Sequence, residues 1–409
     1  MPKDNIKEQD LTTNWISSEN SKFETSKLLY KALKTQRRYS PSKTMRNCGL
    51  SLVQDQSDMK LTPIHQKVIG MKHKGKGNAS GVLCNVNEHG VSVSGVGFCQ
   101  SPFCVTCMGY KRTERMQRIT DGLRVARDKN MHAYFVTLTI QRTDDIKQQT
   151  KDLFYGYKCL LDKIAYRTKK QGIETYHVRN LDITFRVNQK DVYHTHLHCI
   201  FIFDREIEPY KDKKTKVDIT DIPMMIEHAW VDIQTSKNVI ASLQGQHVEK
   251  VQHDEKLSRY VSKFEGLSKE LSNFAHKTGK KTKLDQKSIG YMELLGHVAN
   301  ENMKCIAVYR EFLKAMKNCR TVSFSRNWKL LESEKPEQEE DIETESETEQ
   351  IHVSVNWFLC MGRQFDMFCL ILHKAFLENK LEIIEDVLSE HPKIELLYFL
   401  RSYFCIDVS

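Results

Sequence analysis

Residues 193–203, YHTHLHCIFIF, constrain the fold of this chain more than any other stretch. Histidine occupies every second position of the first half, and an unbroken apolar run follows. Alternate side chains of a β-strand point to opposite faces, so His194, His196 and His198 share one face and Leu197 lies on the other. The pattern predicts a strand that holds a metal ion on one face and enters a core with the other. The alternative is a partly buried strand whose histidines only form hydrogen bonds.

A second strand is predicted at 178–187, directly before the histidine strand. The polar residues 188–191 form a link short enough for an antiparallel hairpin. In this hairpin Asp182 shares a face with Thr184 and Arg186. We therefore expect the Asp182 carboxylate to reach the histidines.

Four cysteines precede this sheet region: Cys84, Cys99, Cys104 and Cys107. The start of the chain has no apolar signal-peptide region, so we expect a cytoplasmic location. In a reducing compartment, cysteines serve metal binding or core packing rather than disulfides. Four thiolates suit a closed tetrahedral zinc site. Cys48 is the reserve fourth ligand in place of Cys84, and cysteines packed in a core without metal are the alternative.

The charge distribution favours a polyanionic partner. The net charge is +9, yet the run from Glu332 to Glu349 contains ten acids and one base, which leaves +18 for the rest. Lys and Arg gain affinity by releasing counterions from a phosphate backbone. The helix expected after the cysteines carries Lys111, Arg112 and Arg115, which we expect to contact DNA, although a merely solvated basic surface is the alternative. No apolar run is long enough to span a bilayer, so no membrane partner is expected.

The predicted fold class is α+β, with a central antiparallel sheet, flanking helices, a cysteine-rich zinc-binding insertion and a helical C-terminal segment. The predicted parts are a flexible basic arm (1–80), the cysteine cluster with a basic helix (81–130), the sheet domain (131–331), an acidic linker (332–350) and a small helical segment (351–409). Other predicted elements are helices at 26–38, 144–170, 223–230, 253–271 and 309–317, strands at 133–140 and near 238–251, and an extended piece at 320–331.

Several motifs stand in an order that resembles the HUH endonuclease superfamily, and within it the rolling-circle plasmid replication initiators of the Rep class. The resemblance runs from about Cys84 to Trp328. Its motifs are Cys99-X4-Cys104-X2-Cys107, Phe135-Val136-Thr137-Leu138-Thr139, Tyr193-His194-Thr195-His196-Leu197-His198, Tyr260-Val261-Ser262-Lys263, Tyr309-Arg310-Glu311-Phe312 and Ser323-Phe324-Ser325-Arg326. The order of these motifs, rather than any one of them, makes the resemblance specific.

The resemblance implies a metal site and a covalent reaction. His196 and His198 would hold Mg²⁺ or Mn²⁺ with Asp182 as third ligand. His194 would support the ion or the substrate, and taking the place of Asp182 is its alternative role. Two imidazoles and a carboxylate leave coordination positions open, as a catalytic site requires. Tyr260 would attack the scissile phosphate, giving a 5′-phosphotyrosyl link and a free 3′-hydroxyl primer.

Lys263 would neutralise the phosphate or favour the phenolate, because a free phenol with a pKa near 10 is weakly nucleophilic at neutral pH. The chain departs from the family at one position. Related initiators have a glutamate four residues before the tyrosine, which is Lys256 here. Glu255 is the nearby substitute for activating water in the terminating hydrolysis, although i−5 and i−4 lie on different faces of a helix.

The expected partners are plasmid origin DNA, as a single strand or a hairpin, and a host helicase and polymerase. A conjugative relaxase or a single-tyrosine transposase is one alternative, but relaxases usually carry the tyrosine before the histidines and those transposases are much shorter. The other alternative is a non-catalytic, zinc-containing DNA-binding protein in which His196 and His198 are structural.

Overall fold

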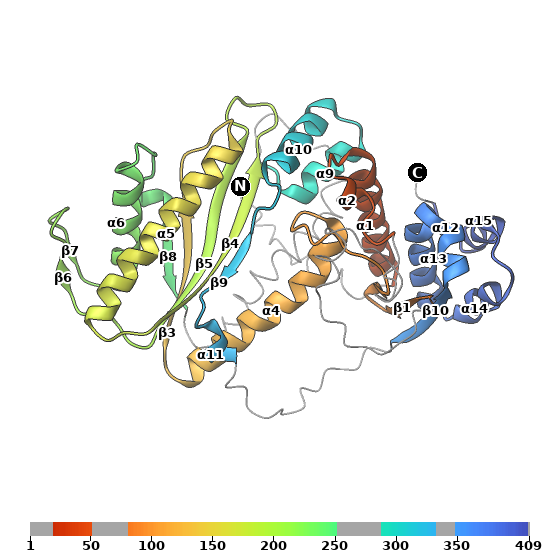
Figure 1. The fold of residues 1–409 in the computed structure, drawn as a ribbon, viewed down its shortest axis with the longest axis horizontal. Coiled ribbons are helices and arrows are strands. Elements are labelled where there is room, and N and C mark those ends of the chain that lie inside the picture. Colours follow the sequence, from red (N-terminus) through yellow and green to blue (C-terminus); the bar gives the residue numbers. More distant parts are fainter. Residues whose placement is uncertain (1–18, 51–80, 252–287, 333–347, 408–409) are drawn as a thin grey trace, which may run out of the picture.

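The computed structural model describes residues 19–50, 81–251, 288–332 and 348–407 (Figure 1). The helices are α1 (Glu19–Tyr39), α2 (Lys43–Arg46), α4 (Val105–Asp128), α5 (Ile146–Lys170), α6 (Ile222–Thr235), α9 (Tyr291–Ala299), α10 (Met303–Ala315), α11 (Trp328–Glu332), α12 (Val355–Met361), α13 (Phe365–Leu377), α14 (Leu381–Ser389) and α15 (Ile394–Tyr403). The strands are β1 (Gly81–Asn87), β2 (Gly90–Ser94), β3 (His132–Thr139), β4 (Thr175–Phe185), β5 (Tyr193–Phe203), β6 (Tyr210–Lys211), β7 (Asp218–Ile219), β8 (His247–Lys250), β9 (Val322–Phe324) and β10 (Glu349–Ser354).

The central sheet has five strands in the order β8-β3-β5-β4-β9, and every pair is antiparallel. The histidine strand is β5, and β4 and β5 form the predicted hairpin. Its register puts His196 opposite both Asp182 on β4 and Thr139 on β3. His198 is likewise opposite Thr137 on β3. Because cross-strand partners point to the same side, the register brings the polar residues of three strands together.

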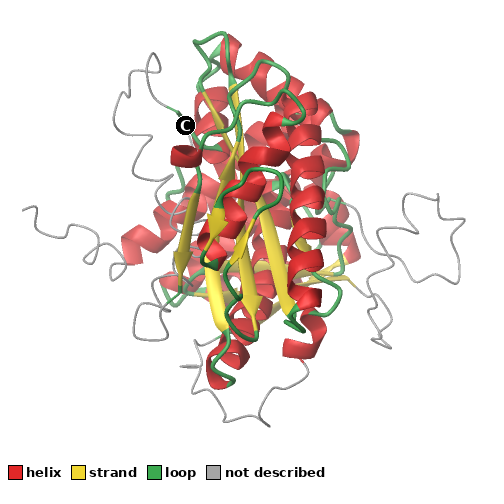
Figure 2. Cartoon of the chain, turned by 90° about the vertical axis from the view of Figure 1, so that its left-hand side faces the viewer, coloured by secondary structure: helices red, strands yellow, loops and turns green. Residues whose placement is uncertain are grey.

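One face of this sheet is mostly apolar, although His177 and Arg179 of β4 also lie on it, against Tyr157 and Phe154 of α5. Leu197 and Phe201 of β5 are fully buried on it, and the amphipathic helix α5 and the more apolar α6 cover it, with Leu153 and Trp230 in the same core. The Asp145 side chain caps α5 by accepting a hydrogen bond from the Gln148 amide at 2.9 Å. Figure 2 shows helices against both faces of the sheet.

The histidine face is divided along its length. Its far half carries apolar side chains, among them Phe135 and Ile202, which pack against Leu123 of α4 and Trp328 of α11. The Trp328 indole donates a hydrogen bond to the Arg118 carbonyl at 3.3 Å, which fixes α11 along α4. The near half stays polar and carries the histidines. Helix α4 packs closely against the apolar half, and its Met108 and Arg115 also border the polar half.

A smaller sheet, in the order β10-β1-β2, joins the two ends of the described chain. Cys84 of β1 pairs with Ile351 of β10, and both lie in a second core with Phe368 of α13. The C-terminal helices gather at one end of the molecule, beside β1 and α1 (Figure 1). Residues 349–350, expected in the acidic linker, begin strand β10. The parts predicted as consecutive along the chain are thus intertwined in space.

The N-terminal region also differs from the prediction where the structure describes it. The helix expected at 26–38 is α1, and it is packed rather than part of a flexible arm. Phe23 is buried in the C-terminal core and Ala32 in the main core, so α1 bridges the two. Arg37 of α1 forms a bidentate ion pair with Asp366 of α13, with N–O distances of 2.6 and 2.8 Å.

The fold is a mixture of helices and antiparallel sheets with a cysteine cluster, as the sequence predicts at this level. The C-terminal part, predicted as a small helical segment, contains four α-helices among its described residues, and the strand expected near 238–251 is limited to β8. The extended piece at 320–331 is a short strand, β9, followed by α11. In the part of the chain that the structure describes, no helix is long and apolar enough to cross a membrane.

Candidate metal centres

Asp182, His196 and His198 converge on one point of the polar half of the sheet. Their ligand atoms all lie within 4.8 Å of one another. The Asp182 Oδ2 atom is 2.9 Å from His196 Nε2 and 3.7 Å from His198 Nε2. The sequence prediction of these three residues as one cluster is therefore confirmed as geometry. A metal ion would receive two imidazole nitrogens and one carboxylate, a set that leaves positions open for water or substrate.

Neighbouring residues hold His198 in position. Its Nδ1 atom is 3.1 Å from the Thr137 hydroxyl, which leaves Nε2 directed toward Asp182. The Phe135 ring stacks on the imidazole with a centroid distance of 5.6 Å and an interplanar angle of 17°. A hydrogen bond to the second ring nitrogen is the usual way in which proteins orient a histidine ligand. The His196 Nδ1 atom, by contrast, is buried without a hydrogen-bond partner among the described residues.

Electrostatics hold the Asp182 side chain ionised. Burial raises the pKa of this carboxyl, but hydrogen bonds from His196 and His198 lower it more, so that the pKa ends well below its usual value. The carboxylate is not sealed off, since 37% of the Asp182 side chain is exposed. An anionic ligand with two adjacent imidazoles is thus available at neutral pH, on a surface that a substrate can reach.

A pocket of about 140 Å³ adjoins the triad and lies between the sheet and α4. Asp182 and His198 line it on the sheet side, and Arg115 and Met108 line it on the α4 side. Arg115, one of the three bases predicted to contact DNA, therefore faces the same space as two members of the triad. The side chains of the other two, Lys111 and Arg112, are outside those that the structure describes.

His194 lies next to the triad but does not belong to it. Its ring centroid is 5.4 Å from that of His196. Burial, followed by the positive charges of Arg142 and Arg186, lowers the pKa of His194 to about 4, although Asp182 acts in the opposite direction. The imidazole is therefore neutral at pH 7.

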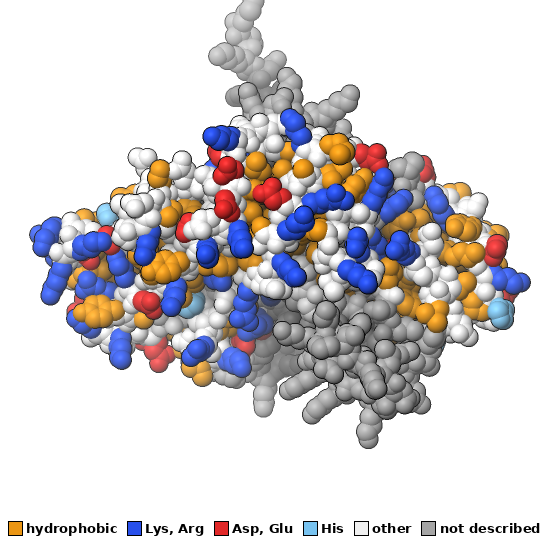
Figure 3. Space-filling model, turned by 45° about the horizontal axis from the view of Figure 1, so that its top comes forward, with side chains coloured by type: hydrophobic (Ala, Val, Ile, Leu, Met, Phe, Trp, Pro, Cys, Tyr) orange, Lys and Arg blue, Asp and Glu red, His pale blue; other side chains and the backbone are white. Residues whose placement is uncertain are grey.

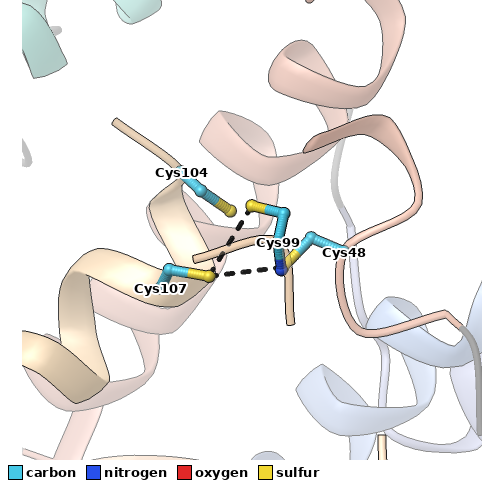
Figure 4. A group of neighbouring side chains, drawn as sticks. All are labelled: Cys48, Cys99, Cys104 and Cys107. Carbon is cyan, nitrogen blue, oxygen red and sulfur yellow. Dashed lines mark hydrogen bonds between the residues drawn. The ribbon is translucent and has the colours of Figure 1, made fainter. Parts of the chain in front are cut away.

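The second cluster consists of four cysteine thiols: Cys48, Cys99, Cys104 and Cys107 (Figure 4). All sulfur atoms lie within 4.8 Å of one another, with the Cys107 sulfur 3.6 Å from that of Cys48 and 3.7 Å from that of Cys99. Such a group can bind a metal such as zinc. The set corrects one predicted ligand, because Cys48 stands where Cys84 was expected.

The physical reason for this correction is the position of Cys84. It lies in β1, in the core shared with the C-terminal helices, where its thiol hydrogen-bonds to Cys369. Cys48, in contrast, follows α2 and is brought to Cys99 by a backbone hydrogen bond from the Gly49 amide to the Gly97 carbonyl, at 2.9 Å. Gly49 has a φ of +76°, a conformation that favours glycine. The glycine that follows Cys48 is the feature of the sequence from which this turn could have been predicted.

The start of α4 favours negative charge at the cysteine cluster. Cys104 is the N-cap residue of this helix and Cys107 lies in its first turn, where the helix dipole stabilises thiolates. Hydrogen bonds from neighbouring thiols, that of Cys107 first, lower the pKa of Cys104 far below its usual value. The pKa values of the other three thiols are raised, mainly by Cys104 and by burial. A bound cation would offset the mutual repulsion of neighbouring thiolates, because the thiolate is the form of cysteine that binds metal.

The remaining predicted site residues, Tyr260, Lys263 and Glu255, lie outside the described residues, as does the predicted helix 253–271. Sequence reasoning used Thr137 only as part of a strand motif and assigned no role to Gln36. Gln36 is fully buried and connects α1 to the cysteine cluster, accepting from the Val105 amide at 2.8 Å and donating to the Cys104 sulfur at 3.4 Å.

No family model, curated protein or solved structure matches this chain.

Proposed function

We propose that this protein is a metal-dependent DNA-nicking enzyme that initiates rolling-circle replication of a plasmid. The observation that carries the proposal is the convergence of Asp182, His196 and His198 on a polar patch of an otherwise packed sheet face. The motif order in the sequence adds the nucleophile, Tyr260, at a position after the histidines. The resemblance to the HUH superfamily also supports the proposal that the antiparallel sheet belongs to an HUH-like fold.

In this proposal the triad holds Mg²⁺ or Mn²⁺, which would polarise the scissile phosphate and offset its developing charge. The Tyr260 oxygen forms a bond to phosphorus while the bond from phosphorus to the 3′ oxygen breaks. The phenol proton leaves to solvent, and the departing 3′ oxygen gains a proton, so that a 3′-hydroxyl is released. Lys263 favours the attack by stabilising the phenolate or the phosphate charge.

The surface charge supports a DNA partner. On the face displayed in Figure 3, Lys and Arg side chains are more abundant than Asp and Glu. Arg115 lies across the pocket from Asp182 and His198, where it would contact a DNA phosphate near the ion. A host helicase and a polymerase that extends the 3′-hydroxyl would complete the reaction in the cytoplasm. The cysteine cluster would hold zinc and fix the start of α4 beside this site.

A second candidate function is a non-catalytic DNA-binding protein stabilised by zinc. It is favoured by the cysteine cluster, which has four ligands and three fully buried members. In that case the hydrogen bonds between Asp182 and the two histidines would be structural only. The two functions differ in one observable, which is a covalent bond between the protein and DNA.

The test uses single-stranded fragments that tile the DNA flanking the gene, incubated with purified protein and Mn²⁺. Because a 5′-phosphotyrosyl link keeps the 3′ portion of the strand on the protein, a 3′ label should move to the protein band on a denaturing gel. A 5′ label on the same fragment should be released in a shorter product. The opposite labelling pattern would overturn the proposed polarity.

Two variants assign the roles in this test. Tyr260→Phe should form no adduct, and an adduct formed by this variant would overturn the assignment of the nucleophile. His196→Ala should retain DNA binding but lose cleavage, and unchanged cleavage would overturn the metal site. Cleavage by neither the wild-type protein nor any variant on the complete tiling set would favour the non-catalytic candidate.

A further inference from the structure

Two arginines stand beside the metal triad at the same end of the sheet. Arg142 follows β3, and Arg186 follows β4 on the face that also carries Asp182 and Thr184. Both act electrostatically on His194, the histidine next to the triad. The order on this face is therefore metal ligands, then His194, then the two guanidinium groups.

The two arginines share one hydroxyl group. The Arg142 Nη2 atom donates to Ser288 Oγ at 2.8 Å, and the Arg186 Nε atom donates to the same oxygen at 3.4 Å. Arg186 Nη1 also donates to Gln189 Oε1 at 3.1 Å. No ion pair neutralises either guanidinium among the described residues. Asp191, in the turn between β4 and β5, influences Arg142 electrostatically but forms no ion pair with it.

Among the described residues, neither guanidinium charge is neutralised and one guanidinium donor has no hydrogen-bond partner. The Arg142 Nη1 atom is buried and has no partner among the described residues. Burial, and next the positive charge of Arg186, lower the pKa of Arg142 from its usual value. A buried donor without a partner costs free energy, and two adjacent like charges repel each other. An ordinary surface arginine, which is fully hydrated, has neither feature.

An anion placed between the two guanidinium groups would relieve both costs. Two parallel N–H groups of a guanidinium match two oxygens of a phosphate and form charge-assisted hydrogen bonds with them. The Ser288 hydroxyl and the His194 ring can add further hydrogen-bond donors. The four groups surround one end of the site on which the proposed function places a DNA strand.

We propose that Arg142 and Arg186, together with Ser288 and His194, bind a backbone phosphate of the single DNA strand next to the scissile one. This inference rests on the proposed function, since it takes the strand to lie across the triad. Strand geometry of about 3.4 Å per residue separates Arg186 from Asp182 by roughly 14 Å at the backbone. Long arginine side chains span part of this distance, so the bound phosphate belongs to a neighbouring nucleotide.

The experiment measures the binding of a fluorescent oligothymidylate in buffer without added Mg²⁺ or Mn²⁺, with all proteins carrying Tyr260→Phe so that no cleavage can occur. Affinity is determined at salt concentrations between about 50 and 200 mM, because the slope of log K against log salt reports the number of phosphates neutralised, about 0.7 per phosphate of a single strand. Arg142→Gln/Arg186→Gln should weaken binding about tenfold or more. It should reduce the slope by about 0.7, the value for one shared phosphate.

Two controls make the result specific. Arg205→Gln removes an exposed arginine at the opposite end of β5, and it should leave slope and affinity unchanged. Arg142→Lys/Arg186→Lys retains the charges, so it should retain the slope while it loses affinity through the missing fork geometry. A Gln double variant that is folded by circular dichroism and has the wild-type slope overturns the proposal.

A free anion is the other possible source of the phosphate group, and titration with inorganic phosphate distinguishes it. Binding of phosphate that both glutamine substitutions abolish, with an unchanged slope for DNA, would show a small-anion site and overturn the DNA assignment. A failure of the nicking assay with a reduced slope in the Gln variant would have a different meaning. It would refute the proposed enzyme while the phosphate site on single-stranded DNA stands.

Discussion

The two candidate metal centres are built in opposite ways. The triad takes its ligands from two neighbouring strands, and the hydrogen-bond register of β4 and β5 positions them without help from an ion. The cysteine cluster takes its ligands from segments separated by up to 59 positions in the sequence, the turn after α2 and the start of α4. The triad thus lies partly exposed on a sheet face, whereas the closed set of thiols connects distant segments. We therefore expect loss of the first site to affect activity and loss of the second to affect folding.

The largest expected effect is on the cysteine cluster. Cys48→Ala should abolish zinc binding and lower the free energy of unfolding by about 5 kcal/mol or more, since binding energy at a structural zinc site is folding energy. Zinc content by atomic absorption and unfolding in urea measure the two quantities. Cys84→Ala is the matched control, and it should keep its zinc although it creates a small cavity in the second core. A zinc-free Cys84→Ala protein would restore the original ligand prediction.

At the triad, the change Asp182→Asn should affect activity far more than stability. The variant keeps the shape of the side chain but loses the anionic ligand, so nicking should fall about 10³-fold or more. The thermal midpoint without added Mg²⁺ or Mn²⁺ should change little, because the side chain is partly exposed. Rates of adduct formation and calorimetry without added Mg²⁺ or Mn²⁺ provide the two measurements. A loss of folding comparable to that of Cys48→Ala would contradict the contrast between the centres.

The hydrogen bond between Thr137 and His198 should contribute less. Thr137→Val removes the hydroxyl that orients this imidazole and should weaken Mn²⁺ binding about 10- to 100-fold, as changes behind a metal ligand typically do. Isothermal titration with Mn²⁺ measures this effect. Thr184→Val, on the same face opposite His194, removes a similar hydroxyl farther from the ligands. Equal losses in the two variants would mean that His198 does not depend on Thr137.

The smallest expected effect concerns the pH dependence of the free energy of unfolding, through His177 on the sheet face that packs against α5. Burial lowers the pKa of His177, which hydrogen-bonds to Tyr157, to about 4. Its contribution to stability is complete above the unfolded pKa of about 6.5 and is lost as the pH falls toward 4. Between pH 6.5 and 5 the wild type should lose about 2 kcal/mol from this group.

The His177→Phe variant should show a flatter stability profile over the same range, measured by urea unfolding at equal zinc content. An identical slope in wild type and variant would mean that this imidazole becomes protonated within the folded protein.

The sequence alone determined the local features. Period-two alternation identified β3 and β5, the short polar link identified the β4–β5 hairpin, and the register of that hairpin is sufficient to place Asp182 beside His196. These predictions succeeded because strand periodicity and tight turns depend on residues close together in the chain.

Only the tertiary structure decided which segments distant in sequence meet. In the structure Cys48, and not Cys84, lies with the other three cysteines, and β1 pairs with β10. Arg142 and Arg186 both donate to Ser288. Each of these contacts depends on how helices and sheets bury their apolar faces, and a cysteine or arginine has no periodic pattern that reveals its distant partner. The local sequence pattern therefore identified the strand that carries the candidate metal ligands. The packing of the whole chain determined which side chains surround that strand.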